Sequence, residues 1–247
     1  CMLSCSFLDV VPPETEGPDD FLIEAEDALK YLYGCYGTLL NNNTKVLSYN
    51  TLAFGSDEVV GPETVYDHFR KQQCNQVTGY NVASSGGVWG PYYQGIGYCN
   101  KFIADITTYD VKNLTNSDKV NYIAEAKFLK AYYHYKLMSA CGPIPIIDSQ
   151  LPMSLPKEQI PGRSHFDACT DYVVNLCDEV YPDLEKDFDY NSRYYGRATK
   201  MAAKMLKAKV LVLAASPLWN GSFYDKSWKN EKYETPGYGY ELVSKVY

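Results

Sequence analysis

Residues 121–147 hold the pattern that most constrains how this chain can fold. They predict a long helix that is apolar on most of its sides and is followed at once by Gly142, Pro143 and Pro145. One face carries residues spaced three or four apart, and further apolar residues widen that face. The first set is Ala126, Leu129, Tyr133, Leu137 and Ala140, and the second is Tyr122, Ile123, Tyr132 and Met138. We expect Gly142 to take the left-handed conformation that ends a helix, with the prolines preventing its continuation. Such a helix must pack between other helices, which predicts an interlocked helical scaffold.

The charge of the chain limits its partners. The net charge is −7 over 247 residues, and no block of basic residues interrupts the acidic balance. This argues against nucleic acid or an anionic membrane surface as the main partner. No apolar run approaches the length of a membrane span. The chain is long enough to bury a large core in one domain.

The cysteines and histidines do not show the spacing of a metal or redox site. The eight cysteines include no Cys-x-x-Cys pair, and the three histidines lie far apart. We therefore expect no metal and no cofactor. Four cysteines in helical patterns read as small core residues, namely Cys35, Cys99, Cys169 and Cys177. A disulfide between Cys1 and Cys5, or one that involves Cys141, remains open. His134, inside the aromatic helix, is more typical of a hydrogen-bonded core histidine than of a catalytic base.

The rest of the chain predicts further helices and no strands. Apolar residues at helical spacing indicate helices over about 20–40, 88–106, 118–140, 165–185 and 199–215, with Ser117 or Asp118 capping the third and Thr199 the last. Residues 141–164 contain five prolines and predict a long loop. The expected fold class is therefore all-α, with long loops between helix pairs.

The first residues resemble the end of a bacterial lipoprotein leader. Ser4 directly precedes Cys5, and residues 6–18 are rich in proline and predict an extended tether. We expect Cys5 to be lipidated, residues 1–18 to be a leader remnant and tether, and residues 19–247 to form one helical domain. Two acyl chains on one cysteine would hold the protein at a membrane. A frayed N-terminus with incidental cysteines is the alternative.

Ligand-binding residues are expected mainly in the loop 55–88, because loops on a rigid scaffold commonly carry binding groups. Trp89, at its end, is a second kind of candidate, since an exposed indole ring can stack on a sugar. Burial statistics instead favour a core position for Trp89, on one helical face with Tyr92 and Tyr93. The candidates are Asp57, Glu58, Tyr66, Arg70, Tyr80, Asn81 and Trp89.

No catalytic constellation is present in the sequence, so we expect a binding protein and not an enzyme. Asp57 and Glu58 are adjacent carboxylates that could serve as acid and base in glycoside hydrolysis. Adjacent residues point apart in a helix or strand, so the pair is weak support for that chemistry. A secreted glycoside hydrolase remains the alternative from another class.

Several segments in the same order resemble the SusD/RagB family of outer-membrane lipoproteins from Bacteroidetes. The blocks are residues 3–12, the Trp-x-x-x-Tyr…Cys-Asn pattern of residues 89–100, residues 125–135 with the Gly-Pro-Ile-Pro of 142–145, and residues 196–200 with 214–220. Lys127 and Lys130 stand where arginine is common in the family.

The resemblance implies a scaffold of tetratricopeptide-like helix pairs. It also implies a lipid-anchored protein at the cell surface, in the outer membrane, which captures glycan together with a SusC-like TonB-dependent barrel and supports import of oligosaccharides. Capture of oligopeptides by the same scaffold, as in the RagB branch, is the alternative. Family members are longer, so the resemblance also implies that a later region, beyond Tyr247, is missing. The matched blocks belong to the scaffold and transfer no ligand residue.

Overall fold

The structure is a computed structural model, and it describes residues 17–40, 89–152, 154–220 and 228–243. Within these residues the long elements are the helices α2 (Ala25–Leu40), α7 (Trp89–Thr108), α8 (Asn116–Cys141), α9 (Phe166–Val180) and α10 (Lys200–Ala214). Two short ones are α1 (Pro18–Phe21) and the 3₁₀ turn η2 (Lys157–Gln159). The described residues form isolated bridges but no strand, so the all-α prediction is confirmed for them.

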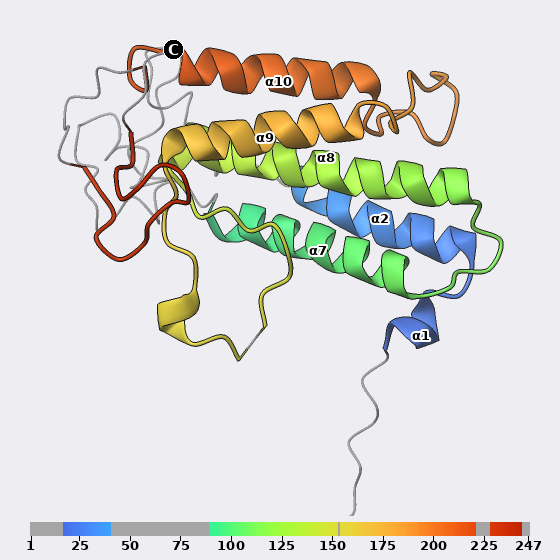
Figure 1. The fold of residues 1–247 in the computed structure, drawn as a ribbon. Coiled ribbons are helices and arrows are strands. Elements are labelled where there is room, and N and C mark those ends of the chain that lie inside the picture. The colour runs from blue at the N-terminus through green and yellow to red at the C-terminus, as the bar shows by residue number, and fades with distance from the viewer. Residues whose placement is uncertain (1–16, 41–88, 153, 221–227, 244–247) are drawn as a thin grey trace, which may run out of the picture.

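Helix α8 is the centre of the scaffold, as the aromatic pattern predicted. It packs against α2, α7, α9 and α10, while α7 also packs on α2 and α9 on α10 (Figure 1). Its predicted inner face is fully buried at Ala126, Leu129, Tyr133 and Leu137. Only Ala140, in the last turn, is exposed.

Close approach of α7 to α8 depends on a glycine. A Cβ atom on Gly95 would lie 2.8 Å from Cε2 of Tyr133, which is too close for any side chain there. The Tyr133 hydroxyl reaches across to α2 and donates a hydrogen bond to the Cys35 carbonyl at 2.5 Å. The three helices therefore meet around one buried tyrosine.

The start and end of several helices differ from the prediction. The single helix expected over 20–40 is two helices, because the backbone between them pairs with residue 112: Lys112 N–H donates to Ile23 O at 2.9 Å, and Ala25 N–H donates to Lys112 O at 3.0 Å. The cap of α8 is Thr115, whose hydroxyl accepts from the Asp118 N–H at 3.1 Å, and not Ser117 or Asp118. The cap of α10 is Thr199, as predicted.

Helix α8 ends at Gly142, which has a φ of 70° as expected for a glycine stop. Its ψ of −133° is not left-handed helical, so that part of the prediction is wrong and the chain turns directly into an extended segment. A Cβ on Gly142 would lie 2.6 Å from Cη2 of Trp219. Trp219 is buried there and stacks on Phe166, with ring centroids 4.3 Å apart.

The four cysteines predicted as core residues, Cys35, Cys99, Cys169 and Cys177, are buried and free, and Cys141 is half-buried and free. Cys1 and Cys5 lie outside the described residues. None of the helices in the described parts combines the length and apolar character needed to cross a bilayer.

Candidate ligand-binding cavity

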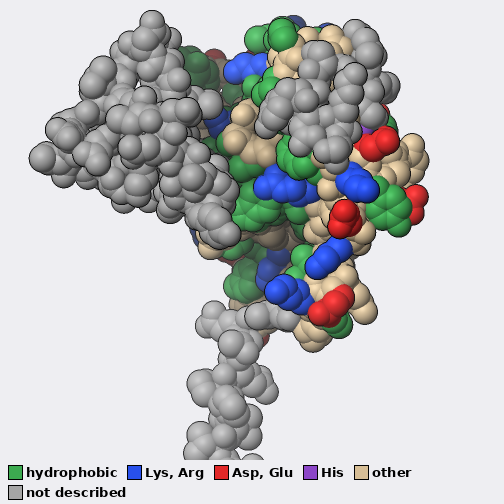
Figure 2. Space-filling model, turned by 90° about the vertical axis from the view of Figure 1, so that its left-hand side faces the viewer, with side chains coloured by type: hydrophobic (Ala, Val, Ile, Leu, Met, Phe, Trp, Pro, Cys, Tyr) green, Lys and Arg blue, Asp and Glu red, His purple; other side chains and the backbone are tan. Residues whose placement is uncertain are grey.

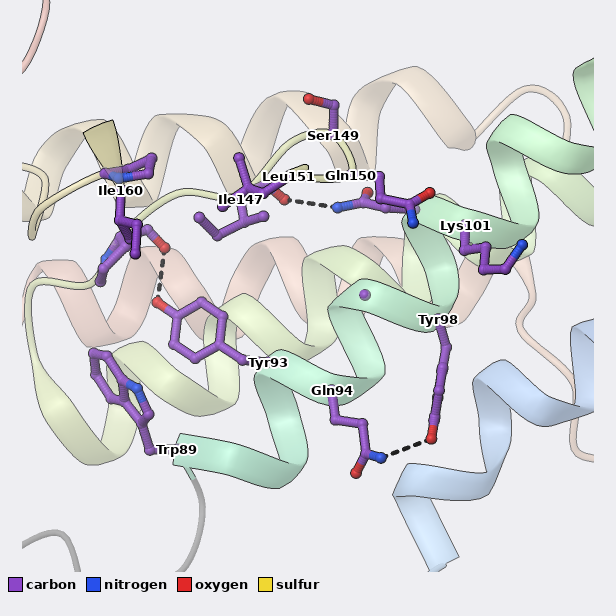
Figure 3. A pocket seen from close by; sticks show the side chains of 14 residues that line it. Trp89, Tyr93, Gln94, Tyr98, Lys101, Ile147, Ser149, Gln150, Leu151 and Ile160 are labelled. Atoms are coloured by element: carbon purple, nitrogen blue, oxygen red, sulfur yellow. Dashed lines mark hydrogen bonds between the residues drawn. The ribbon is translucent and has the colours of Figure 1, made fainter. Parts of the chain in front are cut away.

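A cavity of about 820 Å³ lies between α7 and the proline-rich loop that follows α8 (Figure 3). The α7 wall is formed by Trp89, Tyr93, Gln94, Gly97, Tyr98, Asn100 and Lys101. The loop wall is formed by Pro145, Ile147, Ser149, Gln150, Leu151, Ile160 and Pro161.

The α7 wall arises from helical spacing. Residues 89, 93, 97 and 101 are each four apart and therefore share one side of the helix. Trp89 and Tyr93 contact each other at its beginning, with ring centroids 4.9 Å apart and planes inclined by 56°. In the neighbouring row, Gln94 Nε2 donates to the Tyr98 hydroxyl at 2.7 Å. The result is an aromatic surface with amide and hydroxyl groups beside it.

Hydrogen bonds fix the first part of the loop wall, at Pro145 and Ile147, to the helices. The Tyr93 hydroxyl donates to Pro145 O at 2.8 Å, and Asn100 Nδ2 donates to Ile147 O at 3.3 Å; Figure 3 shows both bonds. The N–H of Ile147 donates to Nε2 of His134 at 3.3 Å. These bonds hold the loop wall against α7 and α8.

A charged contact completes this attachment at Asp148. The buried Lys130 ammonium donates to both the backbone carbonyl and the Oδ1 of Asp148, each at 2.9 Å. The Tyr172 hydroxyl donates to the same Oδ1 at 2.7 Å. Burial acts to raise the pKa of Asp148, but these hydrogen bonds outweigh it, and the pKa lies below its ordinary value.

His134 has the structural role that the sequence predicted. Its Nδ1 lies 2.8 Å from the Lys130 carbonyl, and its Nε2 accepts from Ile147, so the neutral ring is used at both nitrogens. Complete burial lowers the pKa of His134 to about 4. The ring therefore supports the loop as a neutral group and is not exposed to a ligand.

The polar groups of the cavity suit hydrogen bonding to a ligand. Among the described residues that line it, none is acidic, and the cation is Lys101, which pairs with Asp105 at 2.7 Å. The buried Oδ1 of Asn100 has no hydrogen-bond partner within the described residues. A flat apolar surface beside amides and hydroxyls fits a ligand with a C–H face and several hydroxyl groups. The lining residues that the structure describes include no pair of carboxylates for acid–base hydrolysis.

Only one of the residues predicted to bind ligand lies in the described structure. Trp89 has 36% of its surface exposed and lines the cavity, so the core position favoured by burial statistics is wrong. It is the first residue of α7 within the described part of the chain. The other predicted residues lie outside the described residues: Cys5, Asp57, Glu58, Tyr66, Arg70, Tyr80 and Asn81.

The sequence reasoning missed the loop wall. Residues 141–164 were predicted only as a long loop, although an apolar, proline-rich segment directly after a buried helix is a signal that it packs back onto the scaffold. In the parts that the structure describes, no group of three His, Cys, Asp or Glu side chains could hold a metal ion.

The face in Figure 2 shows acidic and basic side chains interspersed among the described residues, with no broad basic area.

Comparisons with known proteins agree with this architecture. The solved structure of BT4246 is similar, with a TM-score of 0.80 and 37% identity over 91% of this chain and 37% of that chain. The surface glycan-binding protein A from Bacteroides fluxus shares the fold, with a TM-score of 0.60 and 22% identity over 76% of this chain and 40% of that chain. A SusD-like protein from Bacteroides ovatus is 26% identical over 151 residues, which are 61% of this chain and 26% of the relative.

This chain therefore spans well under half the length of these relatives. A family profile described as "Starch-binding associating with outer membrane" matches residues 6–212, which is most of the chain. The resemblance inferred from the ordered sequence blocks is thus confirmed, and the chain belongs to the SusD-like family.

Proposed function

We propose that this protein is a cell-surface glycan-binding lipoprotein and not an enzyme, and that it binds oligosaccharides in the cavity between α7 and the loop 142–161. The observation that carries the proposal is the exposed Trp89, which forms an aromatic surface with Tyr93 on the wall of the cavity. Membership of a family described as starch-binding supports glycan as the ligand class.

The two walls would have different roles in binding. The indole of Trp89 and the phenol of Tyr93 offer stacking surface for the C–H face of a sugar ring. Gln94, Ser149 and Gln150 offer donors and acceptors to hydroxyl groups from both sides of the cavity. A sugar bound there would replace water at these groups, and the described lining residues include no acidic side chain.

Calorimetry of binding tests the site. The ligands are a panel of neutral oligosaccharides that includes maltoheptaose, a starch fragment, with oligopeptides of mixed sequence as the comparison. We expect an oligosaccharide to bind and Trp89→Ala to weaken that binding at least about tenfold, or 1.4 kcal/mol. Tyr190→Ala is the matched control, because Tyr190 is a 78% exposed aromatic that does not line the cavity.

Two outcomes would contradict the proposal. Tight binding of oligopeptides alone would favour the peptide-capturing alternative. An oligosaccharide affinity that Trp89→Ala leaves unchanged would place the site elsewhere, for example among the loop candidates Asp57, Glu58, Tyr66, Arg70, Tyr80 and Asn81.

The cellular part of the proposal is anchoring at the outer membrane through lipid on Cys5, with a SusC-like TonB-dependent barrel as partner in import. The lipoprotein-like residues 3–12 and the outer-membrane association of the family support it. Cys5→Ser should abolish labelling by a radioactive fatty acid and release the protein from membranes. Affinity purification from outer membranes should recover a large barrel protein, and its repeated absence would contradict the partnership.

A further inference from the structure

Arg163 links Trp89, on the α7 wall of the cavity, to the end of α8 and the turn that follows it, from outside the cavity. Its guanidinium carbon lies over the ring of Trp89, 5.2 Å from the centroid, which is within the range of a cation–π contact. Nη1 of the same side chain donates to Cys141 O at 2.9 Å and to Pro143 O at 2.5 Å. Arg163 is half-buried and is not one of the residues that line the cavity.

The guanidinium is held in place independently of Trp89. The last carbonyls of a helix have no partner within the helix, and a basic side chain near them is favourable. Arg163 satisfies this need at the end of α8 and in the turn that follows. The backbone around it is also fixed, since Ser164 N–H donates to Ile144 O at 3.0 Å and Asn230 Nδ2 donates to Arg163 O at 3.2 Å.

Within the described residues, the Trp89 ring has fewer constraints than the Arg163 guanidinium. It is the first residue of α7, it is partly exposed, and its described ring contacts are Tyr93 and Arg163. An exposed aromatic ring at the end of a helix can take several rotamers, and only some of them present its face to the cavity. A fixed cation over the ring selects among them.

We infer that Arg163 is a positioning residue for the aromatic surface of the cavity, and that it holds the Trp89 indole in the orientation that receives a ligand. Arg163 acts through Trp89 and not by contact with the ligand. The role in ligand binding rests on the proposed function, whereas the effect on the indole orientation does not.

Fluorine NMR of the protein labelled with 5-fluorotryptophan tests the effect on orientation without any ligand. The chain has three tryptophans, and Trp89→Phe assigns one of the three resonances to Trp89. We expect one sharp Trp89 resonance in the otherwise unaltered protein. Arg163→Met should shift or broaden it clearly more than the Trp219 and Trp228 resonances, and should increase quenching of tryptophan emission by acrylamide. Arg163→Lys should have an intermediate effect, because lysine keeps the charge but loses the planar fork.

Arg193→Met is the matched control. Arg193 lies over a different aromatic ring, Tyr194, at 4.8 Å, and neither residue lines the cavity. This variant should leave the Trp89 resonance unchanged. The inference would be overturned if Arg163→Met did not change the Trp89 resonance, or changed it no more than the other two.

A double-mutant cycle with maltoheptaose as the probe tests the consequence for binding. Arg163→Met should weaken binding about three- to tenfold when Trp89 is present, and should have no further effect in the Trp89→Ala background. Equal weakening in both backgrounds would overturn an action through Trp89. If maltoheptaose did not bind even the unaltered protein, the proposal of starch binding would be wrong. The fluorine spectra would still test whether Arg163 orients the Trp89 indole.

Discussion

Arg197 forms a two-point contact with the carboxylate of Glu125, with Nε donating to Oε2 at 3.0 Å and Nη2 to Oε1 at 2.5 Å, and both side chains are buried. The Tyr36 hydroxyl donates to the same carboxylate at 2.6 Å, so α2, α8 and the segment before α10 meet at one charge. Burial raises the pKa of Glu125 and opposes the guanidinium, which acts to lower it.

Removing the arginine should be costly, because it would leave Glu125 buried without its counter-ion. We expect Arg197→Met to lower the free energy of unfolding by about 3–5 kcal/mol, as measured by urea denaturation. Glu125→Gln in the same chain should restore part of that loss. Lys127→Met is the control, since Lys127 pairs with the exposed Glu179 and should cost no more than about 1 kcal/mol. Similar losses for Arg197→Met and Lys127→Met would contradict this account of the buried pair.

The sequence predicted the helices of this scaffold well, because apolar periodicity and capping residues are local signals. It placed the buried face of α8 correctly from Ala126 to Leu137 and found Thr199 as a cap. It missed the break before α2, because the apolar pattern continues through a segment whose backbone pairs with the distant Lys112.

The cavity could be predicted only in part. Trp89 was a candidate, but periodicity could not show that it is partly exposed and lines a cavity. The loop wall depends on contacts between residues far apart in the chain, such as Tyr93 with Pro145 and Lys130 with Asp148. A single sequence does not show which distant residues pair with each other. It shows only that the carbonyls of a proline-rich segment need hydrogen-bond partners, which is true of any such segment.

Replacing Gly142 should lower the stability of the protein for two separate reasons. Its positive φ disfavours any other residue, and a Cβ would meet the Trp219 ring at 2.6 Å. Gly196 also has a positive φ, 94°, but nothing lies within 4 Å of the position of its Cβ, so it shows the cost of a side chain at positive φ without a steric contact. We expect Gly196→Ala to lower the free energy of unfolding by about 1 kcal/mol and Gly142→Ala by a further 1–3 kcal/mol. Equal losses in thermal denaturation would show that the contact with Trp219 is unimportant.

The two contacts of the Lys130 ammonium should differ in strength. Its bond to the Asp148 backbone carbonyl is partly buried and does not depend on the Asp148 side chain, which is 69% exposed. Lys130→Met should therefore lower the free energy of unfolding by about 1–3 kcal/mol and speed amide hydrogen exchange in the loop 142–151. Asp148→Asn, which keeps the carbonyl, should cost at most about 1 kcal/mol. A larger loss for Asp148→Asn than for Lys130→Met would reverse this ranking.

His134 should make the stability of the protein depend on pH below neutrality. Its pKa is about 4 in the folded protein, against 6.5 for an ordinary histidine. The unfolded chain therefore takes up a proton first as the pH falls below 6.5, and stability is lost until the folded ring is also protonated near pH 4. Between pH 7.5 and 4.5 this loss should be about 2–3 kcal/mol.

Urea denaturation of the unaltered protein and of His134→Gln at both pH values measures this contribution. Glutamine can donate to the Lys130 carbonyl and accept from the Ile147 N–H, but it does not titrate. The other two histidines are the same in both proteins, so their effects cancel in the difference. We expect His134→Gln to lose about 2–3 kcal/mol less than the unaltered protein on acidification. Parallel losses would mean that His134 titrates normally, and hence that its ring is not held neutral between Lys130 and Ile147.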